Sequence, residues 1–240
     1  MNTHQRLQTG FTVFGHRGAA GLIPENTLPG FRKALDLGCK GIELDVHRVL
    51  DQDRCPRLCV IHDANVDRTT NRKGNVVDFS AEELSAMDAG DGAGVPLLDE
   101  VIALLPTSPA VVLNIELKGK NTAALTADLI QALPELSVLV SSFDHQELSR
   151  FRAQDPDTPV APLFHRRKPA MTQTAQQLQA ASINISLSMA TPALIAQCQE
   201  AGFPVLVYTV NAYSDAERLK AMGVAGIFTD RPDLMMALQT

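Results

Sequence analysis

The alternation of short apolar runs with amphipathic stretches is the feature of this 240-residue sequence that most constrains its fold. The runs are rich in β-branched residues and predict strands, whereas the stretches carry apolar residues at helical spacing. Strands are predicted at 11–15, 41–48, 58–62, 111–117, 136–142, 159–163, 182–186, 204–210 and 226–229. Helices are predicted at 26–37, 80–88, 97–105, 121–132, 145–154, 171–180, 191–201, 213–222 and 231–239. About eight successive βα units in a chain of this length predict an α/β fold, a closed (β/α)₈ TIM barrel.

Nine strands are one more than such a barrel holds, and the segment 41–62 explains the excess. No helix fits between the strands 41–48 and 58–62, because their linker, LDQDRCPR, is short, polar and contains a proline. The linker favours a wide hairpin turn, so the strand 58–62 is predicted to be an extra strand, antiparallel to the second barrel strand. A turn centred between Asp53 and Arg54 places Asp45 opposite His62. Residues 1–240 then form a single barrel domain with a small insertion at about 63–96.

Local signals mark several of the predicted helix boundaries. Ser80 with Glu83 three residues later forms a capping box, and Asn26 is placed to cap the first helix after the first strand. The N-terminal stretch MNTHQRLQTG, which contains His4, is expected to be an unanchored tail. It lacks the apolar centre of a signal peptide.

The composition argues against some classes of binding partner for this chain. The net charge of −6 and the pI of about 5.5 argue against nucleic-acid binding. No apolar run approaches the roughly 20 residues of a membrane span, so membrane insertion is not expected. The four cysteines match neither a zinc pattern nor a disulfide framework and are typical of reduced thiols in a cytoplasmic protein. A monomer and a homodimer both stay open.

Ionisable and polar residues gather at the carboxyl ends of the predicted strands, where barrel enzymes carry their active sites. In GIELDVHRV, residues 41–49, the apolar positions alternate with an acid, a second acid and a histidine, which therefore share one face of the strand. The candidates, in chain order, are His16, Arg17, Glu43, Asp45, His47, His62, Asp63, Asn114, Glu116, Lys118, Ser142, Asn211 and Asp230.

Three of these acids predict a metal site. Glu43, Asp45 and Glu116 lie on adjacent strands, and close carboxylates repel one another unless some are protonated or a cation lies among them. Oxygen ligands without cysteine suit Mg²⁺ or Ca²⁺. Two histidines and an arginine beside such an ion suit phosphate chemistry, because arginine binds phosphate bidentately and histidine exchanges protons near pH 7.

Simpler structural roles are weighed against these functional ones. A single acid at a strand end is more often an ion-pair partner than a ligand, and Lys118 could neutralise Glu116 instead of contacting phosphate. His47 is expected to support its neighbours or lie at the surface. His145 is expected to begin a helix, and His165 to lie in a solvated loop. Asp63 could cap a turn or orient His62.

The same residues resemble those of the glycerophosphodiester phosphodiesterase family, of the bacterial cytosolic type. The resemblance rests on HR (16–17), ExD (43–45) and HD (62–63), in that order, and on PENT (24–27), RTTNRKGNVVDFSAEEL (68–84), IELK (115–118), YTVN (208–211) and FTDRPD (228–233). These motifs extend from about residue 13 to 233, nearly the whole chain.

The resemblance implies a (β/α)₈ barrel that hydrolyses glycerophosphodiesters to sn-glycerol 3-phosphate and an alcohol. It implies a divalent cation on Glu43, Asp45 and Glu116, with His16 and His62 as the acid/base pair and Arg17 on the phosphate. Lys118 is a further candidate for the phosphate. Tyr208 stands where many members carry tryptophan, and a tyrosine there can pack on the glycerol moiety.

Several alternatives stay open at this level. The nucleophile is either water or the neighbouring 2-hydroxyl of the glycerol, and intramolecular proximity favours the hydroxyl, which gives a cyclic phosphate. His16 is the candidate base and His62 the candidate acid, although the residues do not fix which is which. Rival hypotheses are a lysophospholipid-directed activity, a carboxylate-pair glycosidase and a non-catalytic phosphoester-binding protein. Scarce aromatic residues argue against a choline cage. The choice between Mg²⁺ and Ca²⁺ and the preferred head group are also open.

Overall fold

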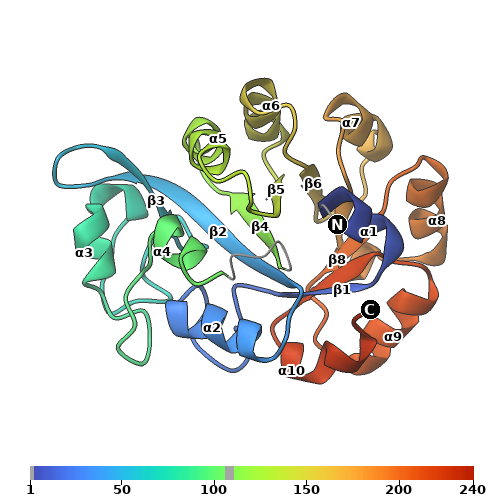
Figure 1. Cartoon of the computed structure of the whole chain (residues 1–240), viewed down its shortest axis with the longest axis horizontal. Helices are drawn as coiled ribbons and strands as arrows, with labels where there is room; N and C mark the ends of the chain where they lie inside the picture. The colour runs from blue at the N-terminus through green and yellow to red at the C-terminus, as the bar shows by residue number, and fades with distance from the viewer. Residues whose placement is uncertain (1–2, 106–110) are drawn as a thin grey trace.

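A computed structural model describes residues 3–105 and 111–240 of the chain, and its centre is a closed barrel of parallel strands (Figure 1). The barrel strands are β1 (Thr12–Gly15), β2 (Gly41–Leu50), β4 (Val112–Leu117), β5 (Val138–Ser142), β6 (Val160–Phe164), β7 (Ile183–Ser186), β8 (Val205–Tyr208) and β9 (Gly226–Thr229). Each strand pairs with the next in parallel, and pairing of β1 with both β9 and β2 closes the circle. The prediction of a (β/α)₈ barrel is confirmed.

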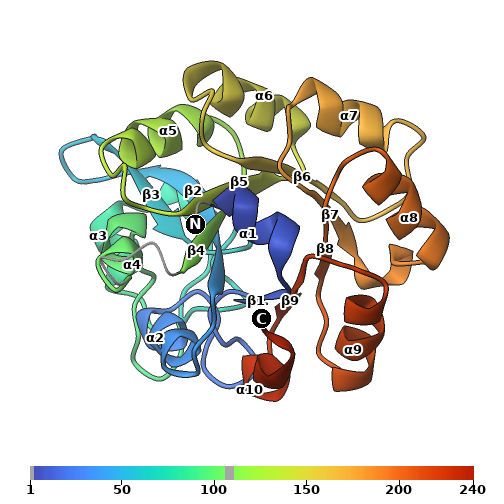
Figure 2. The same ribbon diagram turned by 45° about the vertical axis from the view of Figure 1, so that its right-hand side comes forward.

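Helices follow the strands and cover the outside of the barrel, as the predicted alternation requires (Figure 2). They are α2 (Leu28–Asp36), α4 (Leu98–Ile102), α5 (Ala123–Gln131), α6 (His145–Gln154), α7 (Met171–Gln177), α8 (Pro192–Glu200), α9 (Tyr213–Ala221) and α10 (Pro232–Met235). A large apolar cluster between strands and helices fills this outer layer. No helix within residues 3–105 and 111–240 is both long and apolar enough to cross a membrane.

The ninth strand, β3 (Pro56–Val60), lies outside the barrel and runs antiparallel to the second half of β2, as expected. The expected register is wrong by one residue, because Val46 pairs with Val60 and the partner of Asp45 is therefore not His62. The turn has an odd number of residues: the backbone of Asp51 bonds that of Cys55, and Arg54 adopts a positive φ of 60°. A three-residue turn of this kind ends in a left-handed residue, usually glycine, and arginine gives no signal for it.

The N-terminal stretch is not an unanchored tail. Residues Thr3–Thr9 form the helix α1, which lies across the amino end of the barrel (Figure 2). Its Leu7 is 2% exposed and packs in the barrel interior with residues such as Phe14 and Leu206, and the hydroxyl of Thr3 bonds that of Ser137 at 2.7 Å. α1 therefore plugs the end of the barrel opposite the site described below.

Residues between β3 and α4 form an excursion at the side of the barrel (Figure 1). It contains the short helix α3 (Ala81–Ser85), which begins with the capping box expected for Ser80 and Glu83. The excursion has an apolar cluster of its own, in which Val66, Val76 and Leu84 are fully buried. Because this cluster is separate from the barrel core, side chains on the excursion are positioned partly by local packing.

Candidate active site

A cavity of about 260 Å³ opens at the carboxyl ends of the barrel strands. Its lining includes the predicted residues His16, Arg17, Glu43, His62, Asn114, Glu116 and Tyr208. A larger hollow of about 470 Å³ lies near Phe11 and Lys220 at the amino end of the barrel, but its lining has no acidic or histidine side chain. The smaller cavity is therefore the candidate active site, at the end of the barrel where such sites are found.

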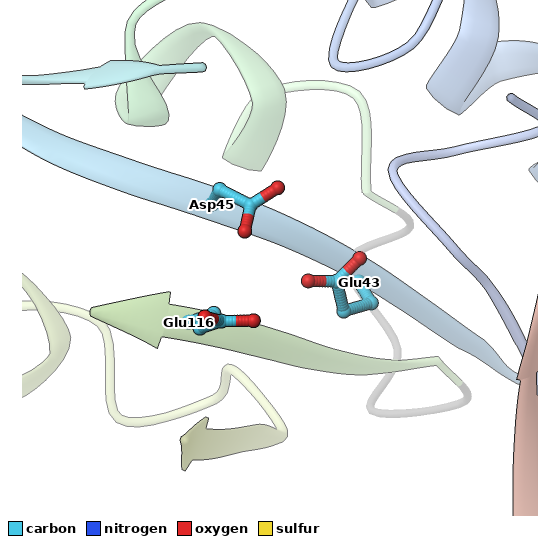
Figure 3. A group of neighbouring side chains, drawn as sticks. All are labelled: Glu43, Asp45 and Glu116. Atoms are coloured by element: carbon cyan, nitrogen blue, oxygen red, sulfur yellow. The ribbon is translucent and has the colours of Figure 1, made fainter. Parts of the chain in front are cut away.

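The three predicted metal ligands lie together (Figure 3). Glu43 and Asp45 project from the same face of β2, and Glu116 projects from β4, where it is the direct partner of Asp45. One oxygen from each carboxylate lies within 4.8 Å of the other two, and the side chains are buried. The alternation in GIELDVHRV and the parallel pairing of two strands are enough to produce this cluster.

Electrostatics makes the cluster a good fit for a cation. Burial, together with the charge of Asp45, raises the pKa values of Glu43 and Glu116. For Asp45, burial would raise the pKa, but the charges of Lys118 and Arg17 outweigh it and lower the pKa. One oxygen of Asp45 is buried without a hydrogen bond. A divalent cation would supply that missing partner and relieve the repulsion, and oxygen donors are what Mg²⁺ and Ca²⁺ prefer.

His16 lies at the end of β1. Its partner comes from the chain just after β9, the strand that pairs with β1 where the barrel closes. Its Nδ1 is 2.6 Å from Oδ1 of Asp230, which follows β9. Asn211 fixes that aspartate, donating to its side chain at 2.7 Å and accepting from its backbone N–H at 2.9 Å. The Nε2 of His16 is 3.9 Å from Glu43. Burial lowers the pKa of His16, but Glu43 and Asp230 together outweigh burial and raise it.

His62 follows β3 and is held by its neighbour in sequence. Its Nδ1 is 2.6 Å from Oδ1 of Asp63, so the predicted orienting role of Asp63 has the required contact. Burial lowers the pKa of His62, and the attraction of Asp45 and Asp63 offsets this effect only in part. A bond from Arg68, followed by the bond to His62, holds the pKa of Asp63 well below its usual range. Both histidines thus use Nδ1 to bond an aspartate, so Nε2 is the nitrogen that can bond a further partner.

Two cations lie against the acid cluster. The backbone N–H of Arg17 donates to Glu43 at 2.9 Å, and its guanidinium bonds Glu25 at 2.8 Å and lies 3.4 Å from Asp45. Lys118 bonds Glu116 at 2.7 Å and lies 3.5 Å from Asp45. Lys118 therefore neutralises acids, as one of its two predicted roles requires, and its position next to the cluster leaves the phosphate role available.

An aromatic wall faces the acids. Tyr208 lines the cavity, and its hydroxyl is buried without a hydrogen-bond partner. The ring of Phe143 meets that of Tyr208 edge-on at 5.8 Å and lies 5.6 Å from the ring of His165, which is in an exposed loop as expected. Sequence reasoning missed Phe143, although its place directly after β5 was a signal.

Other predicted residues make hydrogen bonds around the cavity. His47 is 7% exposed, so a surface position is wrong; its Nε2 is 3.2 Å from the carbonyl of His62. Ser142 donates to the carbonyl of Leu117 at 2.8 Å. Asn114 lines the cavity, and its amide donates to Ser141. His145 begins α6, as expected, and contacts the carbonyl of Leu163.

The polar contacts of three residues at the site were not predicted. Asn26 does not cap α2: Thr27 does, accepting from Gly30, while Asn26 has a φ of 56° and its amide donates to Asp45 at 3.0 Å. Glu25 and Arg68 join the network through the bonds to Arg17 and Asp63 noted above and through bonds to each other. Their motifs, PENT and RTTNRKG, were visible in the sequence, but a motif alone does not give a contact over 43 residues.

A TIM barrel with buried acids, two histidines and two cations at its carboxyl end defines a barrel enzyme suited to phosphate esters. Comparison with known proteins specifies it further. A sequence model of the glycerophosphoryl diester phosphodiesterase family matches residues 16–234. The chain is 34% identical to a glycerophosphodiester phosphodiesterase of Caldanaerobacter subterraneus subsp. tengcongensis, over 94% of this chain and 96% of that protein.

Solved structures agree. An Oleispira antarctica phosphodiesterase in complex with the product sn-glycerol-3-phosphate superposes with a TM-score of 0.86 and 27% identity, covering 97% of this chain and 98% of that one. A glycerophosphodiester phosphodiesterase from Agrobacterium tumefaciens gives a TM-score of 0.81 and 29% identity, covering 95% and 99%. The chain belongs to the glycerophosphoryl diester phosphodiesterase family, and it is an enzyme of that family.

Proposed function

We propose that this enzyme hydrolyses glycerophosphodiesters to sn-glycerol 3-phosphate and an alcohol with His16 and His62 as its acid/base pair. The observation that carries the proposal is the pairing of two histidines, each anchored through Nδ1 to an aspartate, around one buried cluster of three carboxylates. An anchored imidazole keeps one tautomer and one orientation, which is what proton transfer in a defined direction needs. The product bound in the Oleispira relative supports the substrate class.

Glu43, Asp45 and Glu116 are the proposed ligands of a divalent cation, either Mg²⁺ or Ca²⁺. When bound, such an ion withdraws negative charge from the phosphate and orients it. Arg17 and Lys118 flank the carboxylates and add positive charge on the same side of the cavity. We assign the phosphate to these two cations and the glycerol moiety to the face of Tyr208.

The two histidines move protons in opposite directions. His16 takes the proton of the nucleophile, and His62 gives a proton to the departing alkoxide as the bond between phosphorus and the alcohol oxygen breaks. His16 owes its raised pKa to Glu43 and Asp230. A cation held by Glu43 would cancel part of that effect and would favour the neutral imidazole that a base needs. The negative phosphate raises the pKa of His62 toward the protonated form that an acid needs.

The glycerol 2-hydroxyl is the proposed nucleophile. Its attack forms a new bond from that oxygen to phosphorus and releases the alcohol, which leaves a cyclic phosphate; water then opens the ring to glycerol 3-phosphate. An analogue of glycerophosphocholine that lacks the 2-hydroxyl should bind normally. Its turnover should be slower by a factor of about 100 or more, because the intramolecular advantage is lost. Hydrolysis of the 2-deoxy analogue at a rate close to that of glycerophosphocholine would instead assign the attack to water.

A metal titration tests the carboxylate assignment. The purified protein, treated with EDTA, is titrated calorimetrically with MgCl₂ and CaCl₂, and glycerol 3-phosphate release is then followed with the same ions. Glu43→Gln, Asp45→Asn and Glu116→Gln should each weaken ion binding and lose most activity, with partial recovery at high ion concentration. Glu100→Gln serves as the matched control, because Glu100 is exposed and bonds the backbone N–H of Leu97, not a member of the cluster. Unchanged ion affinity in all three variants would remove the metal assignment.

We also propose a cellular compartment and a domain organisation for the enzyme. All four cysteines are free thiols, three of them buried, which is typical of proteins kept in a reducing compartment such as the cytoplasm. We take residues 1–240 as a single catalytic domain, because the excursion after β3 supplies His62 and Asp63 to the barrel site. Size-exclusion chromatography with light scattering distinguishes a monomer from a homodimer.

A further inference from the structure

Arg68 makes the most extensive side-chain network at the rim of the cavity. Its Nε donates to Oδ2 of Asp63 at 2.7 Å. Its two terminal nitrogens donate to the two oxygens of Glu25, each at 2.8 Å. All three nitrogens of one guanidinium are therefore used, and the contact with Glu25 has the parallel, two-bond geometry that makes arginine–carboxylate pairs specific.

Each carboxylate bound by Arg68 also holds a residue of the active site. The other oxygen of Asp63 bonds Nδ1 of His62 at 2.6 Å, and Glu25 accepts from Arg17 at 2.8 Å. A continuous chain of hydrogen bonds thus runs from His62 through Asp63, Arg68 and Glu25 to Arg17. It joins the loop after β1 to the beginning of the excursion after β3.

We propose that Arg68 is a positioning residue that aligns His62 and Arg17 with each other across the cavity. The inference rests on the proposed function, in which His62 protonates the leaving group and Arg17 holds the phosphate. Arg68 touches neither group directly and acts through the two carboxylates.

The local structure around Arg68 suits this task. Its loop is fixed by backbone bonds from Val66 to Gly74 and from Thr70 to Val66, and Val66 is fully buried in the excursion's own core. The position of Arg68 is therefore set by the packing of the excursion, and its side chain transfers that position to the barrel rim. Isolated exposed ion pairs contribute little, but a forked contact to two carboxylates defines a geometry that lysine cannot reproduce.

The test compares Arg68→Met with Arg57→Met. Arg57 is a matched control, because it pairs with one carboxylate, Asp99, at 2.7 Å and has similar exposure, 38% against 47% for Arg68. Arg57 contacts none of the site residues. With glycerophosphocholine, Arg68→Met should lower kcat/KM by about 10–100-fold, through both a lower kcat and a higher KM, the usual scale for partners that orient an active-site group. Arg57→Met should stay within about twofold, as expected for an exposed ion pair.

A second readout separates positioning from folding. Glycerophospho-p-nitrophenol releases an alcohol that needs no proton, so Arg68→Met should lose little of kcat with it while keeping the raised KM. Arg68→Lys should be intermediate, since one ammonium group reaches one carboxylate at a time. In a Glu25→Gln/Asp63→Asn background, Arg68→Met should add no further loss, because its partners are already gone.

The possible results separate a positioning role from a merely structural one. Equal kinetics for Arg68→Met and Arg57→Met, or a full additional loss in the double-variant background, would overturn the positioning role. Equal losses of kcat with both leaving groups would also overturn it and indicate general destabilisation, which thermal unfolding would register. Failure of the proposed function itself looks different, because the unmodified enzyme would then release no glycerol 3-phosphate.

Discussion

His16 and His62 are held by the same bond and by different parts of the molecule. In each case Nδ1 lies 2.6 Å from an aspartate oxygen. The partner of His16 is 214 residues away and is brought to it by the pairing of β1 with β9, which also bonds the backbone N–H of His16 to Thr229. The partner of His62 is the next residue, in a loop whose position depends on the excursion.

The difference suits two different tasks. The His16 side chain is 16% exposed and fixed by closure of the barrel beside the acid cluster, where the proposed mechanism aligns the nucleophile with the phosphate. The His62 side chain is 31% exposed and is placed by a segment outside the barrel, on the side where the proposed mechanism has an alcohol of variable size leave. In the proposed mechanism, the barrel therefore positions the base on the attacking side, and the excursion positions the acid on the departing side.

Removing either imidazole should have the largest effect. His16→Ala and His62→Ala should each lower the turnover of glycerophosphocholine by about 10²–10⁴, the usual scale for general acid–base groups. The double variant should lose far less activity than the product of the two single losses, because the two groups act in one step. Glycerol 3-phosphate release under saturating substrate measures this. Losses that simply multiply would mean that the histidines act in separate steps.

Replacing the aspartates should have a smaller effect that still separates the two pairs. Asp230→Asn and Asp63→Asn should each cost about 10–100-fold in kcat, as for other residues that orient an active-site group. Both remove a bond that raises a histidine pKa.

The pH profiles should then move in a characteristic way. Because the base must be neutral, a lower pKa of His16 in Asp230→Asn should shift the acidic limb of kcat/KM to lower pH. Because the acid must be protonated, a lower pKa of His62 in Asp63→Asn should shift the alkaline limb to lower pH. The groups that act on His62 are Asp45 and Asp63, which raise its pKa, and Lys118 and Arg17, which lower it. The opposite pattern of limbs would exchange the two assignments.

The head group should have the smallest effect. Glycerophosphocholine, glycerophosphoethanolamine and glycerophosphoglycerol should be cleaved at rates within about tenfold, or about 1.4 kcal/mol in the barrier. Phe143 and Tyr208 provide one aromatic wall, not the surrounding set of rings that a quaternary ammonium cage needs. Initial rates with the three substrates test this, and a preference of several hundredfold for choline would contradict it.

The sequence predicted the barrel and the acid cluster because both follow from short-range periodicity. Alternation within β2 places Glu43 and Asp45 on one face, and parallel pairing with β4 brings Glu116 beside them. The hairpin register could not be predicted, because it depends on a left-handed arginine in the turn. Helix α1 was missed because its stretch carries no clear apolar periodicity.

The side-chain network was also beyond prediction, for a related reason. Asn26 has the sequence position of a cap, but its backbone is left-handed and its amide is used by Asp45. The bonds of Arg68 depend on how the excursion folds back on the barrel. Contacts of this kind depend on tertiary packing that no local pattern encodes.

A change of leaving group tests most directly whether His16 acts as the base and His62 as the acid. The measurement is the rate of alcohol release in the first turnover, with choline and with p-nitrophenol as leaving groups, for the unmodified enzyme, His16→Ala and His62→Ala. We expect His62→Ala to be slow with choline and close to the unmodified enzyme with p-nitrophenol, whereas His16→Ala is slow with both. Equal losses for both variants with both leaving groups, or rescue of His16→Ala instead, would contradict this account.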